Sequence, residues 1–260
     1  MARRPVRVLH TSDVHLGTDL PGPQGFRHRP DCQCPIEVIT HLVREHQVDV
    51  VIIAGDLFDH GRVSAELVES TFERLAAITA DVVLLPGNHD VHDDTALYRR
   101  HRGAIDAAGV RFFDAISGHA HDVAGGALRI WARSMEDHSP NYVPLAGVPD
   151  HPGDRWYIVA GHGHFAPERS DEHRSSRITV DHIDASGADY VALGHWHVTT
   201  DLATRGATTP AWYCGAPTFG YGAGRVLLVD FAPGQVVKVQ PIDILDHPAA
   251  SCGARKGDTQ

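Results

Sequence analysis

Short apolar segments that end in acidic, histidine or asparagine side chains recur five times along this chain. Each segment is four to six residues long and rich in Val, Ile, Leu or Ala, the pattern of a buried β-strand. These predicted strands cover residues 6–10, 49–54, 82–85, 156–160 and 189–193. Two further strands are predicted at residues 225–231 and 236–242, with a Pro-Gly turn between them.

The polar clusters begin directly after these strands. Ligands of open α/β sheets bind at the carboxyl-terminal strand ends, and neighbouring strands are only about 4.8 Å apart. Any one cluster is more typical of a turn or a helix cap, but five in the same position are not explained by independent accidents. So many carboxylates and imidazoles in a small volume require a counter-charge, which divalent metal provides. The clusters are Asp13 and His15; Asp56 and Asp59; Asn88, His89 and Asp90; His162 and His164; and His195 and His197.

Helical patterns separate the first three strands. Residues 36–46 and 64–78 repeat apolar side chains at helical spacing, Ser64 is a candidate N-cap, and residues 96–108 form a weaker third pattern. Alternating strands and helices predict a parallel sheet with right-handed crossovers. The later strands have no clear helices between them, so we expect mixed or antiparallel pairing there. Residues 135–155, rich in Pro, Gly, Asp and His, are predicted to form a long functional loop.

The composition is that of a globular protein. The chain has 260 residues, of which 42% are hydrophobic, enough for a substantial core. No apolar run reaches the ~18 residues of a membrane span and no signal peptide is evident, so we predict a cytoplasmic protein. The formal charge of −10 argues against gathering nucleic acid by overall electrostatics. The cysteines lack zinc-finger spacing and are predicted to be free thiols: Cys32, Cys34, Cys214 and Cys252.

The ordered motifs resemble those of the calcineurin-like metallophosphoesterase superfamily. The resemblance is carried by Asp13-x-His15, Gly55-Asp56-x-x-Asp59, Gly87-Asn88-His89-Asp90, His162 and Gly194-His195-x-His197. The phrases LHTSDVHLG, IAGDLFD and ADYVALGHWH are most similar to the Mre11/SbcD-like branch of DNA-repair nucleases. The resemblance covers residues 5–245 and implies an α/β fold, a two-sheet β-sandwich flanked by helices in four αββα layers. We expect one metallophosphoesterase domain over residues 1–246 and a disordered tail over 247–260.

The resemblance also implies two divalent metal ions. One ion would be held by Asp13, His15, Asp56 and His197, and the other by Asp56, Asn88, His162 and His195. Oxygen and nitrogen donors without thiolate suit Mn²⁺, Fe or Zn²⁺, and Mn²⁺ is our expectation. Two ions about 3.5–4 Å apart can generate a hydroxide that attacks a phosphate ester.

Outside the metal ligands, His89 is the predicted catalytic residue. It would protonate the leaving oxygen or stabilise charge on the phosphoryl group, and Asp90 would orient its ring. Asp59 is predicted to support the site without binding metal. His162 and His164 are alternatives for one ligand position, and we favour His162 because it directly follows the strand.

The substrate class stays open. The leading prediction is hydrolysis of a phosphodiester; the alternatives are a DNA exo- or endonuclease of the Mre11/SbcD type, a small-molecule phosphomonoesterase and a non-catalytic scaffold. Single-stranded or end-processed DNA and an ATPase partner are therefore candidate partners, although only two predicted strands and a short tail follow the last motif. Basic runs at residues 27–29, 99–102 and 169–177 are surface charges or phosphate contacts. The histidines at 119, 121, 138 and 151 are predicted to be solvated surface residues.

Overall fold

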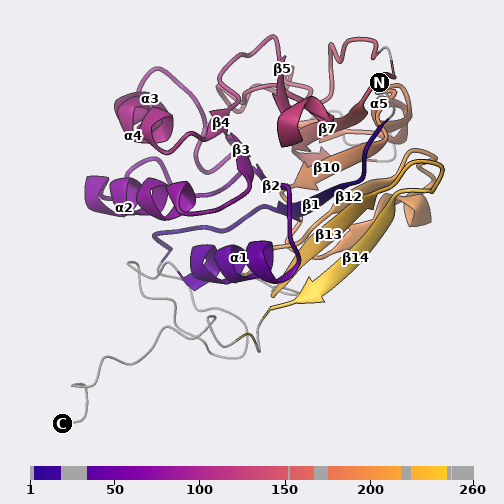
Figure 1. The fold of residues 1–260 in the computed structure, drawn as a ribbon. Helices are drawn as coiled ribbons and strands as arrows, with labels where there is room; N and C mark the ends of the chain where they lie inside the picture. The colour runs from indigo at the N-terminus through magenta and orange to yellow at the C-terminus, as the bar shows by residue number, and fades with distance from the viewer. Residues whose placement is uncertain are drawn as a thin grey trace.

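Two six-stranded sheets pack face to face in the computed structural model, with helices on their outer faces (Figure 1). The structure describes residues 3–18, 34–151, 153–166, 175–217, 224–244 and His247. The predicted α/β sandwich is thus confirmed. The proposed domain boundary at residue 246 stays a prediction, and the predicted tail lies outside the described residues apart from His247.

The first sheet has the strand order β14-β13-β1-β2-β3-β4. Its parallel strands are β1 (Val6–Thr11), β2 (Val50–Ala54), β3 (Asp81–Leu85) and β4 (Arg111–Phe112). Two antiparallel strands complete it, β13 (Arg225–Phe231) and β14 (Lys238–Asp243). The predicted parallel first half is therefore confirmed.

Helices cover the outer face of this sheet (Figure 1). They are α1 (Cys34–Glu45), α2 (Ala65–Ala76), α3 (Leu97–Arg100) and α4 (Arg102–Ala107). Ser64 caps α2 as predicted, because its side chain accepts a hydrogen bond from the Leu67 N–H. The predicted third helix is broken into two because His101 leaves the helical region (φ −111°, ψ 25°).

The second sheet has the order β11-β12-β10-β7-β6-β5 and mixes both strand directions, as expected. It comprises β5 (His119–Val123), β6 (Leu128–Ala132), β7 (Trp156–His162), β10 (Tyr190–Gly194), β11 (Thr200–Asp201) and β12 (Ala211–Tyr213). A small extra pair joins β8 (His164–Phe165) to β9 (Arg177–Ile178), and the short helix α5 (Val180–Asp184) follows.

Three layers of buried apolar side chains hold this arrangement together. One lies between the two sheets, one between the first sheet and its helices, and one on the outer side of the second sheet. Burial on both faces explains why the central strands are continuous apolar runs. No helix among the described residues is long and apolar enough to span a bilayer.

Candidate metal centre

The carboxyl-terminal ends of strands from both sheets meet at one edge of the sandwich. The loops after β1 and β2 run side by side, because the Asp13 N–H donates to the Gly55 carbonyl (3.0 Å). The end of β7 lies against the end of β2, with His162 Nδ1 2.8 Å from the Ala54 carbonyl oxygen. Within the second sheet, His162 pairs with Gly194 of β10. The Asn88 side-chain oxygen, from the loop after β3, lies 2.9 Å from His162 Nε2. Residues from all five predicted clusters therefore reach this edge.

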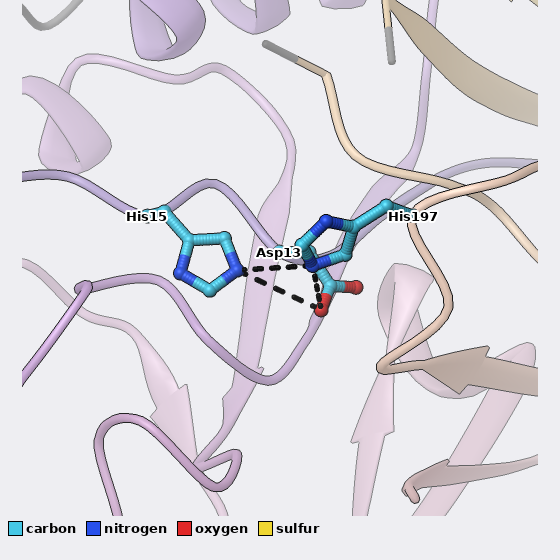
Figure 2. Close-up of side chains that lie close together, drawn as sticks. All are labelled: Asp13, His15 and His197. Carbon is cyan, nitrogen blue, oxygen red and sulfur yellow. Dashed lines mark hydrogen bonds and ion pairs between the residues drawn. The ribbon is translucent and has the colours of Figure 1, made fainter. Parts of the chain in front are cut away.

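One group of donor atoms is formed by Asp13, His15 and His197 (Figure 2). The Nε2 atoms of His15 and His197 are 3.3 Å apart, and Asp13 Oδ1 lies 3.6 Å from the His197 nitrogen and 4.0 Å from the His15 nitrogen. Asp56 Oδ2 approaches the same His15 nitrogen at 3.9 Å. The structure thus brings together the first predicted ligand set.

A second group surrounds the other side of the Asp56 carboxylate. His162 Nε2 lies 3.3 Å from Asp56 Oδ2 and 2.9 Å from Asn88 Oδ1. The same Asn88 oxygen is 2.8 Å from His195 Nδ1. These are the residues of the second predicted set, and Asp56 Oδ2 contacts both groups.

The donor atoms fit divalent metal in spacing and in chemistry. Two donors bound to one ion at about 2.1 Å lie about 3.0–3.4 Å apart in octahedral or tetrahedral sites, close to most of these separations. Asp13 Oδ1 is buried without a hydrogen-bond partner among the described residues, a costly state unless a cation faces it. Its partner oxygen Oδ2 accepts from the Ser12 hydroxyl and from the His195 N–H (3.0 Å). Oδ1 is therefore the oxygen left for metal.

Buried charges perturb one another strongly here. Burial alone would raise the pKa of Asp56, but His162 outweighs it and holds that pKa well below its usual range. Burial would lower the pKa of His162, yet the Asp56 carboxylate raises it to about 10. Burial, and then the charge on His162, lower the pKa of His195 to about 3. In the protein alone, a proton on His162 thus supplies the positive charge that Asp56 needs.

Backbone strain is concentrated at the same place. Asp13, His15, Asp56 and His195 all have left-handed φ angles, of 53°, 50°, 53° and 104°. Such conformations cost on the order of 1–3 kcal/mol each and persist where the surrounding structure enforces them. Gly87 is required for space, because a Cβ there would overlap the Asp56 carboxylate.

Asp59 supports two histidines of the site. Its Oδ1 lies 3.0 Å from His15 Nδ1, on the far side of the ring from the donor nitrogen. Its carbonyl oxygen lies 2.7 Å from His89 Nδ1, and its carboxylate is 3.7 Å from the same atom. His89 packs edge-on against His15, with ring centroids 4.7 Å apart. The placement agrees with the supporting role predicted for Asp59.

The predicted contact between Asp90 and the His89 ring is not made. Asp90 is buried, and its Oδ1 accepts from the Gly87 N–H (2.7 Å). Its Oδ2 accepts from the Phe58 N–H (3.1 Å) and the Tyr98 hydroxyl (2.5 Å). Burial, and then the nearby charge of Asp56, raise the pKa of Asp90. Asp90 therefore ties two loops together while Asp59 orients His89.

The two candidates after β7 have different surroundings. His162 is fully buried among the donor atoms. His164 Nδ1 instead accepts a hydrogen bond from the Trp196 indole N–H (3.2 Å), and its ring is 6.1 Å from that of His195. The placement favours His162 as the ligand.

Three residues near the site were not predicted. Ser12 contacts Asp13 and also lies 3.0 Å from the sulfur of the buried free thiol Cys214. His138, expected to be only solvated, is exposed but has its Nε2 2.8 Å from the Asn88 carbonyl oxygen. The one indication in the sequence was that His138 lies in the predicted functional loop, residues 135–155. Nothing in the sequence around Cys214 indicated its position.

The basic run at residues 99–102 is already engaged by the protein. Arg100 donates to the Gly61 carbonyl (2.7 Å), and Arg102 pairs with Asp106 (2.8 Å) and Asp114 (2.7 Å). These contacts fit the surface-charge alternative. The run at 27–29 and residues 169–174 lie outside the described residues, as do Cys32, Cys252 and the side chain of Cys34.

Comparison with known proteins agrees with this geometry. The family model of calcineurin-like phosphoesterases matches residues 6–199. The chain is 26% identical to the D subunit of the nuclease SbcCD from Bacillus subtilis (strain 168), over 91% of this chain and 69% of that protein. It is 27% identical to the protein of the same name from Escherichia coli (strain K12), over 92% and 68%. The DNA double-strand break repair protein Mre11 of Methanopyrus kandleri is 35% identical over 40% of this chain and 22% of that protein.

The solved structure of TT1561 of Thermus thermophilus has a similar fold, with a TM-score of 0.57 and 13% identity over 92% of this chain and 98% of that one. The chain belongs to the calcineurin-like phosphoesterase family. It is a metal-dependent phosphoester hydrolase, as predicted, and divalent metal is its cofactor.

Proposed function

We propose that the chain is a binuclear phosphodiesterase whose two ions share Asp56. The observation that supports this most is that Asp56 Oδ2 lies within 3.9 Å of His15 Nε2 and 3.3 Å of His162 Nε2. The proposed ligands are Asp13, His15, Asp56 and His197 for one ion, and Asp56, Asn88, His162 and His195 for the other. The nitrogen and oxygen donors suit Mn²⁺, Fe and Zn²⁺ without choosing among them, and Mn²⁺ is the ion that we propose.

Two bound divalent ions supply the positive charge that activates water and neutralises the phosphoryl oxygens. The protein supplies the orientation of its ligands. Ser12 and the His195 N–H fix one oxygen of Asp13, which leaves the other for metal. Asp59 holds the His15 ring by its Nδ1, as carboxylates beside metal-bound histidines do.

His89 is the proposed acid–base residue. A carbonyl oxygen can only accept, so the contact with the Asp59 carbonyl requires the proton on Nδ1 of His89. This leaves Nε2 of a half-exposed ring for the substrate. When the ring is cationic, so that Nε2 carries a second proton, Nε2 can pass that proton to the leaving oxygen and the ring returns to its neutral form. Asp90 contributes by holding the loop that carries Asn88 and His89.

The proposed substrate is a phosphodiester of a single-stranded nucleic acid end or of a small molecule. The relatives named as nucleases and as a break-repair protein support a nucleic acid. The formal charge of −10 and the engagement of Arg100 and Arg102 by the protein argue against strong binding of long duplex by the lone chain. An ATPase partner is a proposal that rests on the same relatives, and the cytoplasmic location stays a prediction.

The test compares three substrates with Mn²⁺ present: a nitrophenyl phosphodiester, the matching monoester and single-stranded DNA. We expect turnover of the diester and of the DNA, and slow turnover of the monoester. Faster turnover of the monoester would make the chain a phosphomonoesterase. No turnover of any substrate by metal-loaded protein would favour a scaffold on the same fold.

A further inference from the structure

Two histidines outside the metal centre face each other on the edge strand β5. His119 Nε2 and His121 Nε2 are 3.2 Å apart, and the ring centroids are separated by 4.8 Å. The residues are two apart in a strand, so they share a face. They pair with Ala132 and Ile130, which belong to the core between the two sheets. The two rings therefore lie at the edge of the inter-sheet layer.

The first sheet reaches the same point. The carbonyl oxygen of Phe112, in its edge strand β4, is 3.3 Å from His121 Nε2. The ring of Phe113 packs against both imidazoles, with centroids 5.1 Å from His119 and 4.8 Å from His121. The cluster thus spans the gap between the edge strands of the two sheets, with its rings held by a buried aromatic side chain.

Hydrogen bonding cannot satisfy all three atoms well. His121 Nε2 faces a carbonyl oxygen, which only accepts, and also His119 Nε2. If His119 Nε2 donates to His121 Nε2, the latter carries a lone pair, which also faces a lone pair of the Phe112 carbonyl oxygen. If His121 carries the proton, that one proton must serve both neighbours. A cation would accept lone pairs from all three atoms, and nitrogen ligands at about 2.05 Å lie about 3.3 Å apart in a tetrahedral site.

We propose that His119 Nε2, His121 Nε2 and the Phe112 carbonyl oxygen form a site for a late first-row divalent cation such as Zn²⁺, Ni²⁺ or Cu²⁺. The ion bridges β5 and β4, the edge strands of the two sheets, and so stabilises the packing of one sheet on the other at this edge. Imidazole nitrogen binds these ions more tightly than Mn²⁺. The proposed site has no carboxylate ligand, unlike the metal centre, where Asp13 and Asp56 face the histidines.

The surroundings of His119 and His121 predict a moderate affinity for the cation. Burial lowers the pKa of His121. The hydrogen bond to the Phe112 carbonyl opposes this effect, and the charges of His119 and Arg111 add to it. The lone pair of His121 is therefore available at neutral pH. Metal at Nε2 of His119 places its proton on Nδ1, which is buried without a partner among the described residues. The nearby Asp114 is already paired with Arg102 (2.7 Å). We therefore expect weaker binding here than at the metal centre.

The test is thermal unfolding of the full chain, saturated with Mn²⁺, before and after Zn²⁺ is added. Zn²⁺ should raise the Tm of the unchanged protein by about 3 °C or more. His121→Ala and the milder His121→Gln should lose most of that increase, whereas His46→Ala, outside the cluster, should keep it. The unchanged protein should also bind one more Zn²⁺ than His121→Gln by equilibrium dialysis.

Cu²⁺ provides a second measurement on the same proteins. Its electron paramagnetic resonance spectrum in the Mn²⁺-saturated protein should show coupling to two imidazole nitrogens, reduced to one in His119→Ala. Equal Zn²⁺ stoichiometry and equal Tm increases in the unchanged protein and His121→Gln would overturn the proposal. Activity of the Mn²⁺-loaded enzyme should be the same in all these variants, which separates this site from the phosphodiesterase centre.

Discussion

Asp59 Oδ1 lies 3.0 Å from Nδ1 of His15, on the side of the ring opposite the nitrogen that faces Asp13 and Asp56. A carboxylate in this position fixes the tautomer of a metal-binding imidazole and raises its basicity. The same residue contacts His89 through its carbonyl oxygen. Asp59 therefore positions one proposed metal ligand and the proposed acid–base residue together.

Removing the Asp59 carboxylate should weaken metal binding. Asp59→Ala is expected to lower Mn²⁺ affinity by about 10–100-fold, the usual cost of losing such a partner. Asp59→Asn keeps a side-chain acceptor for His15, so its loss should be smaller, and both variants keep the backbone carbonyl that contacts His89. Competition with a coloured chelator measures both. Unchanged affinity in Asp59→Ala would show that His15 needs no such partner.

His89 should be separable from the metal ions. His89→Ala is expected to keep its metal content and Tm yet lose turnover of a phosphodiester by ~10²–10⁴-fold, the range for a lost proton donor. His138→Ala, which removes another exposed histidine beside Asn88, is the matched control and should lose less. Loss of metal in His89→Ala would mean that the residue is a ligand.

The two histidines after β7 should behave differently. His162→Ala should lose one ion per chain, because its ring contacts both Asp56 and Asn88. His164→Ala should keep both ions, because His162 is the histidine whose Nε2 meets the Asp56 and Asn88 oxygens. Elemental analysis of the two variants decides the matter, and the reverse pattern would exchange the two assignments.

Metal binding should release a proton. In the protein alone the pKa of His162 is raised to about 10, so the ring is protonated at neutral pH and must lose its proton to bind metal. Below that pKa, the apparent Mn²⁺ affinity should rise about tenfold per pH unit for each proton displaced. His195, with a pKa lowered to about 3, is already neutral and adds no proton. Titration calorimetry in two buffers of different ionisation enthalpy counts the protons, and a count of zero would contradict this.

The strand-end clusters could be predicted because each strand and its polar residues are adjacent in the sequence. Contacts between the sheets could not be predicted in this way. Ser12 and Cys214, for example, are in contact but lie 202 residues apart in the sequence. The predicted contact between Asp90 and the His89 ring was wrong. The two residues are adjacent in sequence, but the Asp90 carboxylate points into the protein, where it accepts from the Gly87 N–H and the Tyr98 hydroxyl. The edge strand β5 was not predicted. Its sequence, His-Ala-His-Asp-Val, contains no apolar run, and its residues are half-exposed or exposed apart from the last.

The central claim is that one carboxylate serves two ions, and Asp56→Asn tests it most directly. The measurement is metal content by elemental analysis after dialysis, beside Asp122→Asn as a control for loss of a surface carboxylate. We predict close to two ions per chain in the control and in the unchanged protein, with well under one ion and almost no phosphodiesterase activity in Asp56→Asn. Two ions retained in Asp56→Asn would contradict the shared-ligand account.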